Sequence, residues 1–226
     1  MEFLVHGEIT ADTKRVIILL HGFPGISTKQ NRDLAPILFE KLGIPTAIVF
    51  YPGLSVNPGK FKYTTAYKLV CDFLNQCLAK NKNIKFEIFG HSFGGYISLR
   101  LAKDFNSHIE KIFLLSPLLH VISDQLLEEL VTKLYRENSQ LERHSLEEFY
   151  EDHNLFVPGY HPDELKKYLA NIKVKLLQSK DDTITPTAVA KEFVKDTTIK
   201  YEESWQEHAF TSDRQEVFDK VVEFFA

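Results

Sequence analysis

The feature that most constrains this chain is an alternation of two kinds of segment along its length. Short runs of β-branched and aliphatic residues alternate with longer segments whose apolar residues recur at helical spacing. This alternation is typical of a parallel sheet covered by helices. The runs are continuous because a strand buried on both faces has no solvent side. Five of them are expected to be central strands: residues 16–20, 46–50, 85–89, 111–115 and 173–177.

Two further strands complete the expected sheet. Residues 3–9 are predicted to add an antiparallel edge strand, and residues 198–202 a more polar strand near the other edge, giving about seven strands. Helices are expected over residues 33–42, 66–78, 96–105 and 214–225. The fold class is therefore α/β, a mostly parallel sheet with helices on both faces, and residues 1–226 are expected to form one domain.

One interval is too long for a single crossover. Residues 118–172 separate two predicted strands by over fifty residues, where one helix and two short loops usually suffice. Inside it, residues 126–134 carry an apolar stripe, Ser145 and Glu148 match a capping box, and Pro162 has the position of a helix start. We therefore expect a helical insertion within the domain.

Charge and composition exclude several classes of function. The chain has 27 basic and 31 acidic residues, so it lacks the basic excess of a nucleic-acid-binding protein. No apolar run approaches the roughly 20 residues that a membrane span requires. The first ten residues include two glutamates and no apolar run of signal-peptide length, so a cytoplasmic location is expected. Residues 120–172 carry eleven acidic and five basic residues, which is typical of a solvated outer face.

The sequence indicates no metal, cofactor or disulfide. His, Cys and carboxylate residues do not cluster at metal-ligand spacing, and no Gly-x-Gly-x-x-Gly or phosphate loop occurs. Cys71 and Cys77 fall six residues apart in one predicted helix, on different faces and too far apart to bridge. We interpret them as reduced packing residues. The oligomeric state cannot be derived from the sequence.

The strongest local signal is the segment Gly90-His91-Ser92-Phe93-Gly94-Gly95, which follows one predicted strand and precedes a helix. A turn from strand to helix at a single residue forces Ser92 into a strained backbone conformation. Side chains at positions 90 and 94 would collide across this turn, so only small residues fit. The turn raises the Ser92 hydroxyl above the carboxyl edge of the sheet, beside a helix N-terminus that favours negative charge. Ser92 is therefore the candidate nucleophile.

A serine hydroxyl needs a base, and the base needs a carboxylate that orients it. In this strand order the acid follows the serine and the histidine comes last. His208 is the only histidine after the predicted strand at 173–177, so it is the candidate base. Asp181 and Asp182 follow that strand as adjacent carboxylates. Asp182 is preferred because it stands four residues before Pro186, which starts the next helix, but Asp181 stays open.

Attack on an acyl carbon places negative charge on oxygen, which backbone N–H groups must stabilise. Phe93, directly after the nucleophile, is expected to supply one N–H group. Phe23, in the loop after the strand at 16–20, is expected to supply the other. Pro24 cannot donate. His21 and His91 flank the site and are interpreted as structural side chains that hydrogen-bond nearby loops.

Together these motifs resemble the α/β-hydrolase superfamily over nearly the whole chain. The resemblance implies a serine hydrolase with Ser92, His208 and Asp182 as catalytic triad, Phe23 and Phe93 amides as oxyanion hole, and residues 118–172 as a helical cap. The carboxylesterases and lipases of this superfamily carry such a serine pattern, as do thioesterases and some peptidases. The chain differs from larger members in having one leading antiparallel strand where two are usual.

The residues of the insertion are expected to determine the substrate class. Tyr150, Phe156 and Tyr160, together with Leu155 and Val157, could line an apolar acyl pocket. The favoured hypothesis is an esterase that forms an acyl-enzyme with a small-molecule ester. Thioesterase activity, and amidase or aminopeptidase activity with cap carboxylates at 147, 148 and 151 holding a substrate amine, stay open. So does a binding protein that has kept the fold without turnover.

Overall fold

A computed structural model describes residues 2–24, 29–54, 57, 59–137, 142–143, 145–156 and 161–226, and gives only the backbone of residues 29–31 and 137. Seven strands form one sheet in the order β1-β3-β2-β4-β5-β6-β7. β1 pairs antiparallel with β3, and every other pair is parallel. The strands are β1 (Phe3–His6), β2 (Arg15–Leu20), β3 (Thr46–Val49), β4 (Lys85–His91), β5 (Ile109–Leu115), β6 (Lys173–Ser179) and β7 (Lys200–Ser204).

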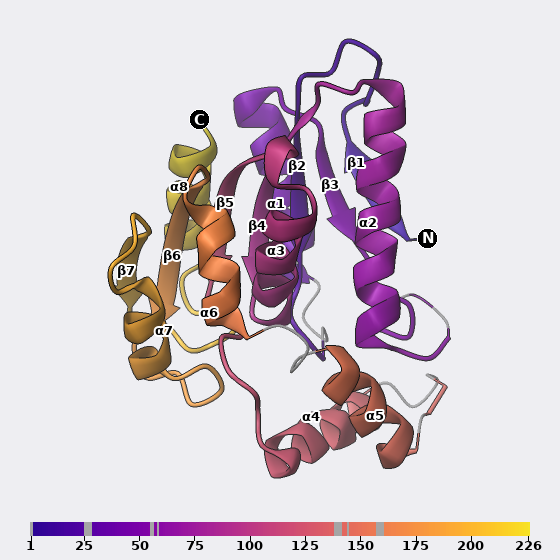
Figure 1. The fold of residues 1–226 in the computed structure, drawn as a ribbon, viewed down its shortest axis with the longest axis vertical. Coiled ribbons are helices and arrows are strands. Elements are labelled where there is room, and N and C mark those ends of the chain that lie inside the picture. Colours follow the sequence, from indigo (N-terminus) through magenta and orange to yellow (C-terminus); the bar gives the residue numbers. More distant parts are fainter. Residues whose placement is uncertain are drawn as a thin grey trace.

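Helices cover both faces of this sheet (Figure 1). Helices α1 and α8 pack on one face, and α2, α3, α6 and α7 on the other. The α/β prediction of about seven strands is confirmed. The helices are α1 (Lys29–Leu42), α2 (Tyr63–Lys80), α3 (Phe93–Asp104), α4 (Asp124–Glu137), α5 (Leu146–Phe156), α6 (Pro162–Leu165), α7 (Thr187–Val194) and α8 (Arg214–Phe225), with short 3₁₀ turns η1 (Asn106–His108) and η2 (Lys166–Leu169).

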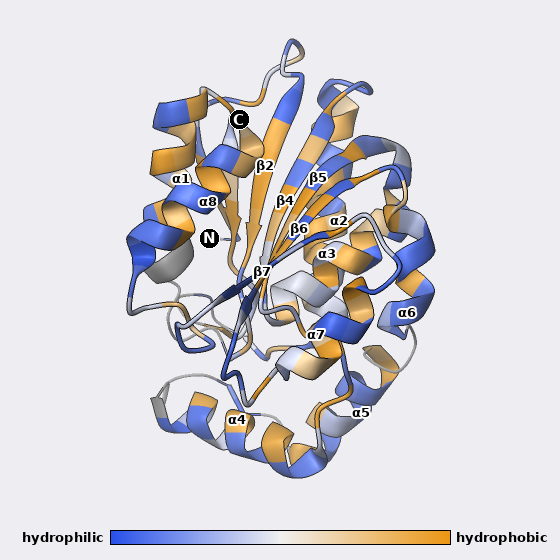
Figure 2. Cartoon of the chain, turned by 90° about the vertical axis from the view of Figure 1, so that its left-hand side faces the viewer, coloured by the Kyte–Doolittle hydropathy of each residue, from blue (hydrophilic) through white to orange (hydrophobic). Residues whose placement is uncertain are grey.

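The central strands are buried on both faces, which explains their continuous apolar runs. In β2, Ile17 and Leu19 join the core under α1 and α8, whereas Val16, Ile18 and Leu20 join the core under α2 and α3. All five side chains are fully buried. Figure 2 shows the same arrangement, with apolar strands between the helical layers. Burial on both faces is what removes the alternation expected of a half-exposed strand.

The predicted boundaries differ from the structure mainly at the ends of elements. β1 ends at His6, three residues early, because Gly7 turns the chain with φ +86°. β7 begins two residues later than predicted, at Lys200. Helix α8 has the predicted bounds, and its start is capped by Asp213, whose side chain accepts a hydrogen bond from Glu216 N.

The long insertion divides into two parts. Helices α4 and α5 lie beyond the carboxyl ends of the strands, at the bottom of Figure 1. Helix α6 and turn η2 return to the core and pack against α3, where Leu165 is fully buried and Asn106 Nδ2 donates to Tyr168 O over 2.7 Å. Among the described residues of the insertion, those of α4 and α5 therefore extend over the edge of the sheet.

Local signals explain how α5 forms and how it attaches to the core. Ser145 and Glu148 make the predicted capping box, each side chain accepting from the other residue's N–H group. Asp152, 8% exposed, accepts hydrogen bonds from Tyr63 N and from the Thr64 hydroxyl at the start of α2. A carboxylate is favourable beside the unpaired N–H groups at a helix N-terminus. Asp152 therefore caps α2 and fixes α5 to the core, a contact that the sequence does not reveal.

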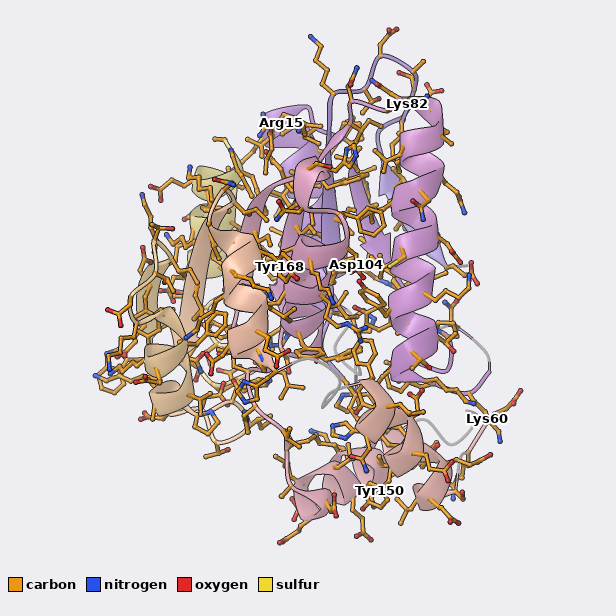
Figure 3. All side chains as sticks on the ribbon, viewed as in Figure 1. Arg15, Lys60, Lys82, Asp104, Tyr150 and Tyr168 are labelled. Carbon is orange, nitrogen blue, oxygen red and sulfur yellow. The ribbon has the colours of Figure 1, made fainter. Side chains whose placement is uncertain are left out.

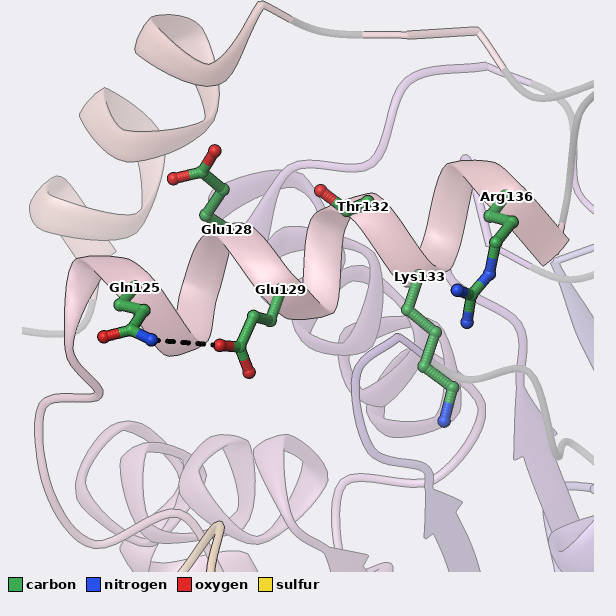
Figure 4. A pocket seen from close by; sticks show the side chains of 6 residues that line it. All are labelled: Gln125, Glu128, Glu129, Thr132, Lys133 and Arg136. Atoms are coloured by element: carbon green, nitrogen blue, oxygen red, sulfur yellow. Dashed lines mark hydrogen bonds between the residues drawn. The ribbon is translucent and has the colours of Figure 1, made fainter.

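Helix α4 presents a mixed-charge surface to solvent. Glu128, Glu129, Lys133 and Arg136 lie along this face (Figure 4), and Gln125 Nε2 donates to Glu129 Oε1 over 3.2 Å. Part of the acidic excess of the insertion therefore occupies a solvated outer face. No helix in the described ranges has the length and apolar character required to cross a membrane. Both cysteines are free thiols, and burial raises the pKa of each to about 11.

Candidate active site

The turn between β4 and α3 carries Ser92 in a strained conformation, with φ 53° and ψ −117°. The Ser92 N–H donates to Leu115 O over 3.0 Å, and the Ser92 carbonyl accepts from Gly95 N and Leu118 N, both at 2.9 Å. Strand β5 and helix α3 therefore fix the turn from both sides. The strand, strained turn and helix that the sequence predicts are present in this order.

The glycines on either side of Ser92 have no room for a side chain. A Cβ on Gly90 would lie 2.2 Å from Ser98 Oγ and 2.5 Å from Gly94 O. A Cβ on Gly94 would lie 2.3 Å from Leu20 O, at the end of β2. The collision that the sequence predicts for Gly94 is therefore with the neighbouring strand and not across the turn. Both glycines allow α3 to begin directly against the sheet, so its N-terminus lies at the edge that carries Ser92.

Asp182 and His208, which follow β6 and β7, meet in the structure. His208 Nδ1 donates to Asp182 Oδ2 over 2.6 Å, because an ionised carboxylate can only accept. Ile184 N and Thr185 N donate to Oδ1 at 2.8 and 2.9 Å, and the Thr185 hydroxyl donates to Oδ2 at 2.7 Å. Asp182 is 8% exposed, whereas Asp181 faces solvent. The geometry therefore favours Asp182 over Asp181 as the carboxylate that orients the imidazole.

The surroundings of Asp182 keep it ionised. Burial raises the pKa of its carboxyl group. The hydrogen bond and charge of His208, together with the hydrogen bonds from Thr185, lower the pKa by more than burial raises it, and the resulting pKa is about 2. A carboxylate that stays charged at every physiological pH can hold the His208 ring with Nδ1 protonated, which directs the lone pair of Nε2 outward.

The lowered pKa of Asp182 predicts a loss of stability in acid. A group whose folded pKa is below its unfolded pKa stabilises the fold above the unfolded pKa, and this stabilisation disappears as pH falls through the folded value. Between pH 5 and pH 2 the unfolding free energy should fall by about 2 kcal/mol more in wild type than in Asp182→Asn. Urea unfolding of both proteins across this range measures the difference. A difference independent of pH would contradict the low pKa.

His91 links the Ser92 turn to the loop that carries His208. Its Nε2 donates to the His208 carbonyl over 2.9 Å, and the two rings are 5.2 Å apart. Burial lowers the pKa of His91 to about 3, so the ring is neutral. His91 is thus a loop-tethering side chain, as expected. In the described part of the chain no hydrogen bond joins Ser92 to His208. Because Nδ1 is bound to Asp182, Nε2 is the nitrogen left to meet the hydroxyl.

The loop after β2 lies directly against Ser92, the candidate nucleophile. A Cβ on Gly22 would stand 3.0 Å from Ser92 Cβ, so the backbone at this point touches the serine. His21 is buried, its Nδ1 lies 2.8 Å from Gly22 O, and burial lowers its pKa to about 4. Phe23 follows in the same loop, and Phe93 is the first residue of α3, where an N–H group has no partner within the helix. Phe93 therefore follows Ser92 directly in the chain, and Phe23 follows Gly22, whose backbone lies against Ser92.

An aromatic cluster covers this part of the site. The Phe23 ring packs 4.9 Å from Phe61 and 5.4 Å from Phe149, and the Phe93 ring lies 4.9 Å from Tyr63 and 6.0 Å from Phe61. Phe149 comes from α5, so the insertion meets the core through the same side chains that flank the predicted oxyanion donors. The side chains of Phe23 and Phe93 therefore pack in apolar surroundings.

The residues predicted to line an acyl pocket, Phe156 and Tyr150, lie in different surroundings. Phe156 is buried against Phe93, Tyr96 and Arg100, next to the cluster. Tyr150 lies within the insertion (Figure 3). Its hydroxyl donates to Asp124 O at the start of α4. Tyr160 falls outside the described residues.

Sequence reasoning missed the aromatic residues that contact Phe23, namely Phe61, Tyr63 and Phe149. Phe149 directly follows the capping box, and an apolar residue at this position of a helix is the sequence feature that could have predicted its inward position. The three glutamates considered for binding a substrate amine are exposed on α5. Of these, Glu148 accepts the Ser145 N–H of the capping box at its Oε2, and the same atom lies 3.6 Å from Lys60 Nζ.

The fold and the Ser92 turn together define a class of protein. A mostly parallel seven-stranded sheet between two helical layers, with a serine at a strained turn after a central strand, is the arrangement of α/β-hydrolases of the serine hydrolase type. Within this class, a family model described as lipid-droplet associated hydrolase matches residues 14–198. The chain belongs to this family. No curated protein matches it.

Solved structures with similar folds include several hydrolases. A hydrolase from Pseudomonas aeruginosa has a TM-score of 0.70 at 14% identity, over 99% of this chain and 93% of that one. A monoacylglycerol lipase from Paleococcus ferrophilus has a TM-score of 0.60 at 20% identity, over 99% and 98%. An esterase from Exiguobacterium antarcticum has a TM-score of 0.63 at 17% identity, over 98% and 94%. These TM-scores show a shared fold.

Proposed function

We propose that this protein is a serine hydrolase that cleaves carboxylic esters through an acyl-enzyme, with Ser92 as nucleophile, His208 as base and Asp182 as orienting acid. The observation that carries the proposal is the 2.6 Å hydrogen bond between His208 and the buried Asp182 carboxylate. His208 lies on a loop that His91, next to Ser92, holds through a hydrogen bond to the His208 carbonyl. An imidazole held by a carboxylate near a strained serine is the arrangement that nucleophilic acyl transfer requires.

In this mechanism His208 Nε2 accepts the Ser92 proton while Ser92 Oγ bonds to the ester carbonyl carbon. The carbonyl oxygen becomes an oxyanion, for which the backbone N–H groups of Phe23 and Phe93 are the proposed donors. Collapse of this intermediate breaks the bond to the alcohol oxygen, and His208 returns the proton to the leaving alcohol. Water then attacks the acyl-enzyme by the same steps, releasing the carboxylic acid and restoring the serine. Asp182 keeps the imidazolium oriented throughout.

The aromatic cluster supports esters with apolar acyl groups as the substrate class. Phe23, Phe61 and Phe149 pack 4.9 to 6.1 Å from one another beside the proposed oxyanion hole, and apolar rings favour burial of hydrocarbon from water. The description of the matching family, lipid-droplet associated hydrolase, agrees with a hydrolase that meets apolar esters.

A panel of neutral aryl and alkyl esters of increasing acyl length tests this proposal. We expect kcat/KM for the best ester to exceed that for acyl-CoA thioesters by on the order of tenfold at low ionic strength, because the acidic insertion repels an anionic substrate. Added salt should reduce the difference. A preference for acyl-CoA at every ionic strength would refute the charge argument, and faster cleavage of aminoacyl arylamides than of any ester would favour a peptidase.

A further inference from the structure

The loop that carries His208 is closed by one side chain. Gln206 lies at one end of this loop and Asp213 at the other, seven residues apart. Gln206 Oε1 accepts from Asp213 N over 2.8 Å, and Gln206 Nε2 donates to Asp213 O over 3.0 Å. Paired bonds of this kind, one accepted and one donated by the same residue, are what a backbone peptide makes in a sheet ladder. The Gln206 side-chain amide thus bonds to the Asp213 backbone as a neighbouring strand would, and it joins the two ends of the loop.

The Gln206 amide is itself fixed by its surroundings. It is 8% exposed, and Nε2 also donates to Glu216 Oε2 over 2.6 Å. The same carboxylate oxygen accepts from the Ser204 hydroxyl over 2.9 Å. A reversed amide would set its carbonyl oxygen against two acceptors, so only one orientation satisfies the network. On the backbone side, the Ser179 hydroxyl donates to Gln206 O over 2.6 Å. Gln206 is therefore bound to β6, to α8 and to the far end of the loop.

The other contacts of the loop fix its middle or its exposed side. His91 binds the His208 carbonyl, and the fully buried Phe210, with φ 51°, anchors the turn in the core. Glu207 accepts hydrogen bonds from Thr211 N and the Ser212 hydroxyl, all within the loop itself. Gln206 is the side chain that bonds to both the N–H and the carbonyl of Asp213, so it controls the angle at which the loop leaves the sheet.

We propose that Gln206 is a positioning residue for the base: its amide closes the loop from residue 206 to residue 213 and so holds the His208 ring at the distance and angle that proton transfer from Ser92 requires. The inference rests on the proposed function. A misplacement of about 1 Å is enough to lower a rate on the order of 100-fold, so a clamp that does not touch substrate can still determine kcat.

The test compares Gln206→Ala and Gln206→Glu with a matched control, Gln215→Ala. Gln215 is an exposed glutamine at the start of α8 whose side chain donates to Asp219 Oδ1 over 2.8 Å, and it makes no side-chain hydrogen bond to the described residues 206–213. For both Gln206 variants we expect kcat for a neutral ester, and the rate at which an organophosphonate labels Ser92, to fall about 10- to 100-fold. KM should change less than about threefold, because the substrate pocket is untouched. The Gln215 variant should match wild type in all three.

Two further measurements separate positioning from a general loss of structure. Exchange of the Asp213 amide hydrogen should accelerate on the order of tenfold in Gln206→Ala, while exchange in β4 and β5 stays unchanged. The double variant Gln206→Glu/Glu216→Gln places a new amide opposite the new carboxylate, so it should recover about tenfold of the rate that Gln206→Glu alone loses.

Each outcome decides the proposal. Faster Asp213 exchange with kcat and labelling within twofold of wild type would overturn it, because the clamp would then not determine the position of the base. So would a loss in Gln206→Ala that is matched by faster exchange throughout the sheet, combined with no recovery in the double variant. Failure of wild-type Ser92 to react with the organophosphonate would instead refute the proposed function, while the exchange rates would still report on the clamp.

Discussion

Replacing Ser92 with alanine should lower kcat for the best ester by about 10⁴-fold or more and abolish covalent labelling by an organophosphonate. The alanine removes the oxygen that forms the acyl-enzyme in the proposed mechanism, so the residual rate reflects binding and oxyanion stabilisation of a direct attack by water. The fold should survive, because the strained turn is held by backbone hydrogen bonds of Ser92 to Leu115, Gly95 and Leu118, which alanine keeps. Steady-state kinetics and intact-mass analysis measure the two effects.

Ser98 provides the matched control for this experiment. It lies on α3, the helix that begins directly after Ser92, is fully buried, and donates to Gly94 O over 2.7 Å. Ser98→Ala should lose about 1 kcal/mol of stability with that hydrogen bond and should keep labelling at Ser92. Retention of ester hydrolysis in Ser92→Ala, with the activity copurifying with the protein, would show that another group attacks the substrate and would remove the basis for the proposed triad.

The fold and most of the site arise from local signals that a sequence can carry. Continuous apolar runs are sufficient to identify buried strands, and the glycines around Ser92 are sufficient to predict a tight strand-to-helix turn. The order in which strands follow one another leaves His208 as the only histidine after β6. The order of serine, acid and histidine along the chain therefore selects the proposed base before any distance is known.

Other parts of the site depend on contacts between residues that are distant in sequence. Whether Asp181 or Asp182 faces the imidazole depends on the path of the loop after β6, where Thr185 and Ile184 direct their N–H groups at Asp182. Nothing in two adjacent aspartates specifies this. The collision at Gly94 involves Leu20 on another strand, and the cap of α2 comes from Asp152, 89 residues further on. Tertiary packing decides these features, so periodicity and motif spacing could not predict them.

The aromatic cluster is missed for a related reason. Phe61 lies just before α2 and Tyr63 is its first residue, whereas Phe149 lies inside the insertion. The contact of Phe149 with Phe23 therefore exists only once α5 docks on the core. The sequence predicts apolar residues in the insertion but gives no register between it and the core. That register determines which rings meet the proposed oxyanion donors, and hence the apolar character of the site.

The substitution Asp182→Asn should lower kcat by about 10³- to 10⁴-fold, less than the loss expected for Ser92→Ala. The introduced amide can still accept from Ile184 N and Thr185 N through its carbonyl oxygen, but its NH₂ group then faces His208 Nδ1. That contact favours the tautomer with Nδ1 unprotonated and a hydrogen on Nε2, which cannot accept the serine proton. The Thr185 hydroxyl also loses its acceptor, so stability should fall by about 1–3 kcal/mol.

Asp181→Asn is the matched control for this substitution, because it makes the same chemical change one residue away on an exposed side chain. It should keep kcat within about twofold of wild type and stability within about 0.5 kcal/mol. Kinetics at several pH values, with urea unfolding of both variants, separate the catalytic loss from the structural one. A large loss in Asp181→Asn with little in Asp182→Asn would mean that the loop after β6 adopts a different path during turnover, with Asp181 as the orienting carboxylate. Equal and small losses in both would mean that His208 needs no carboxylate partner.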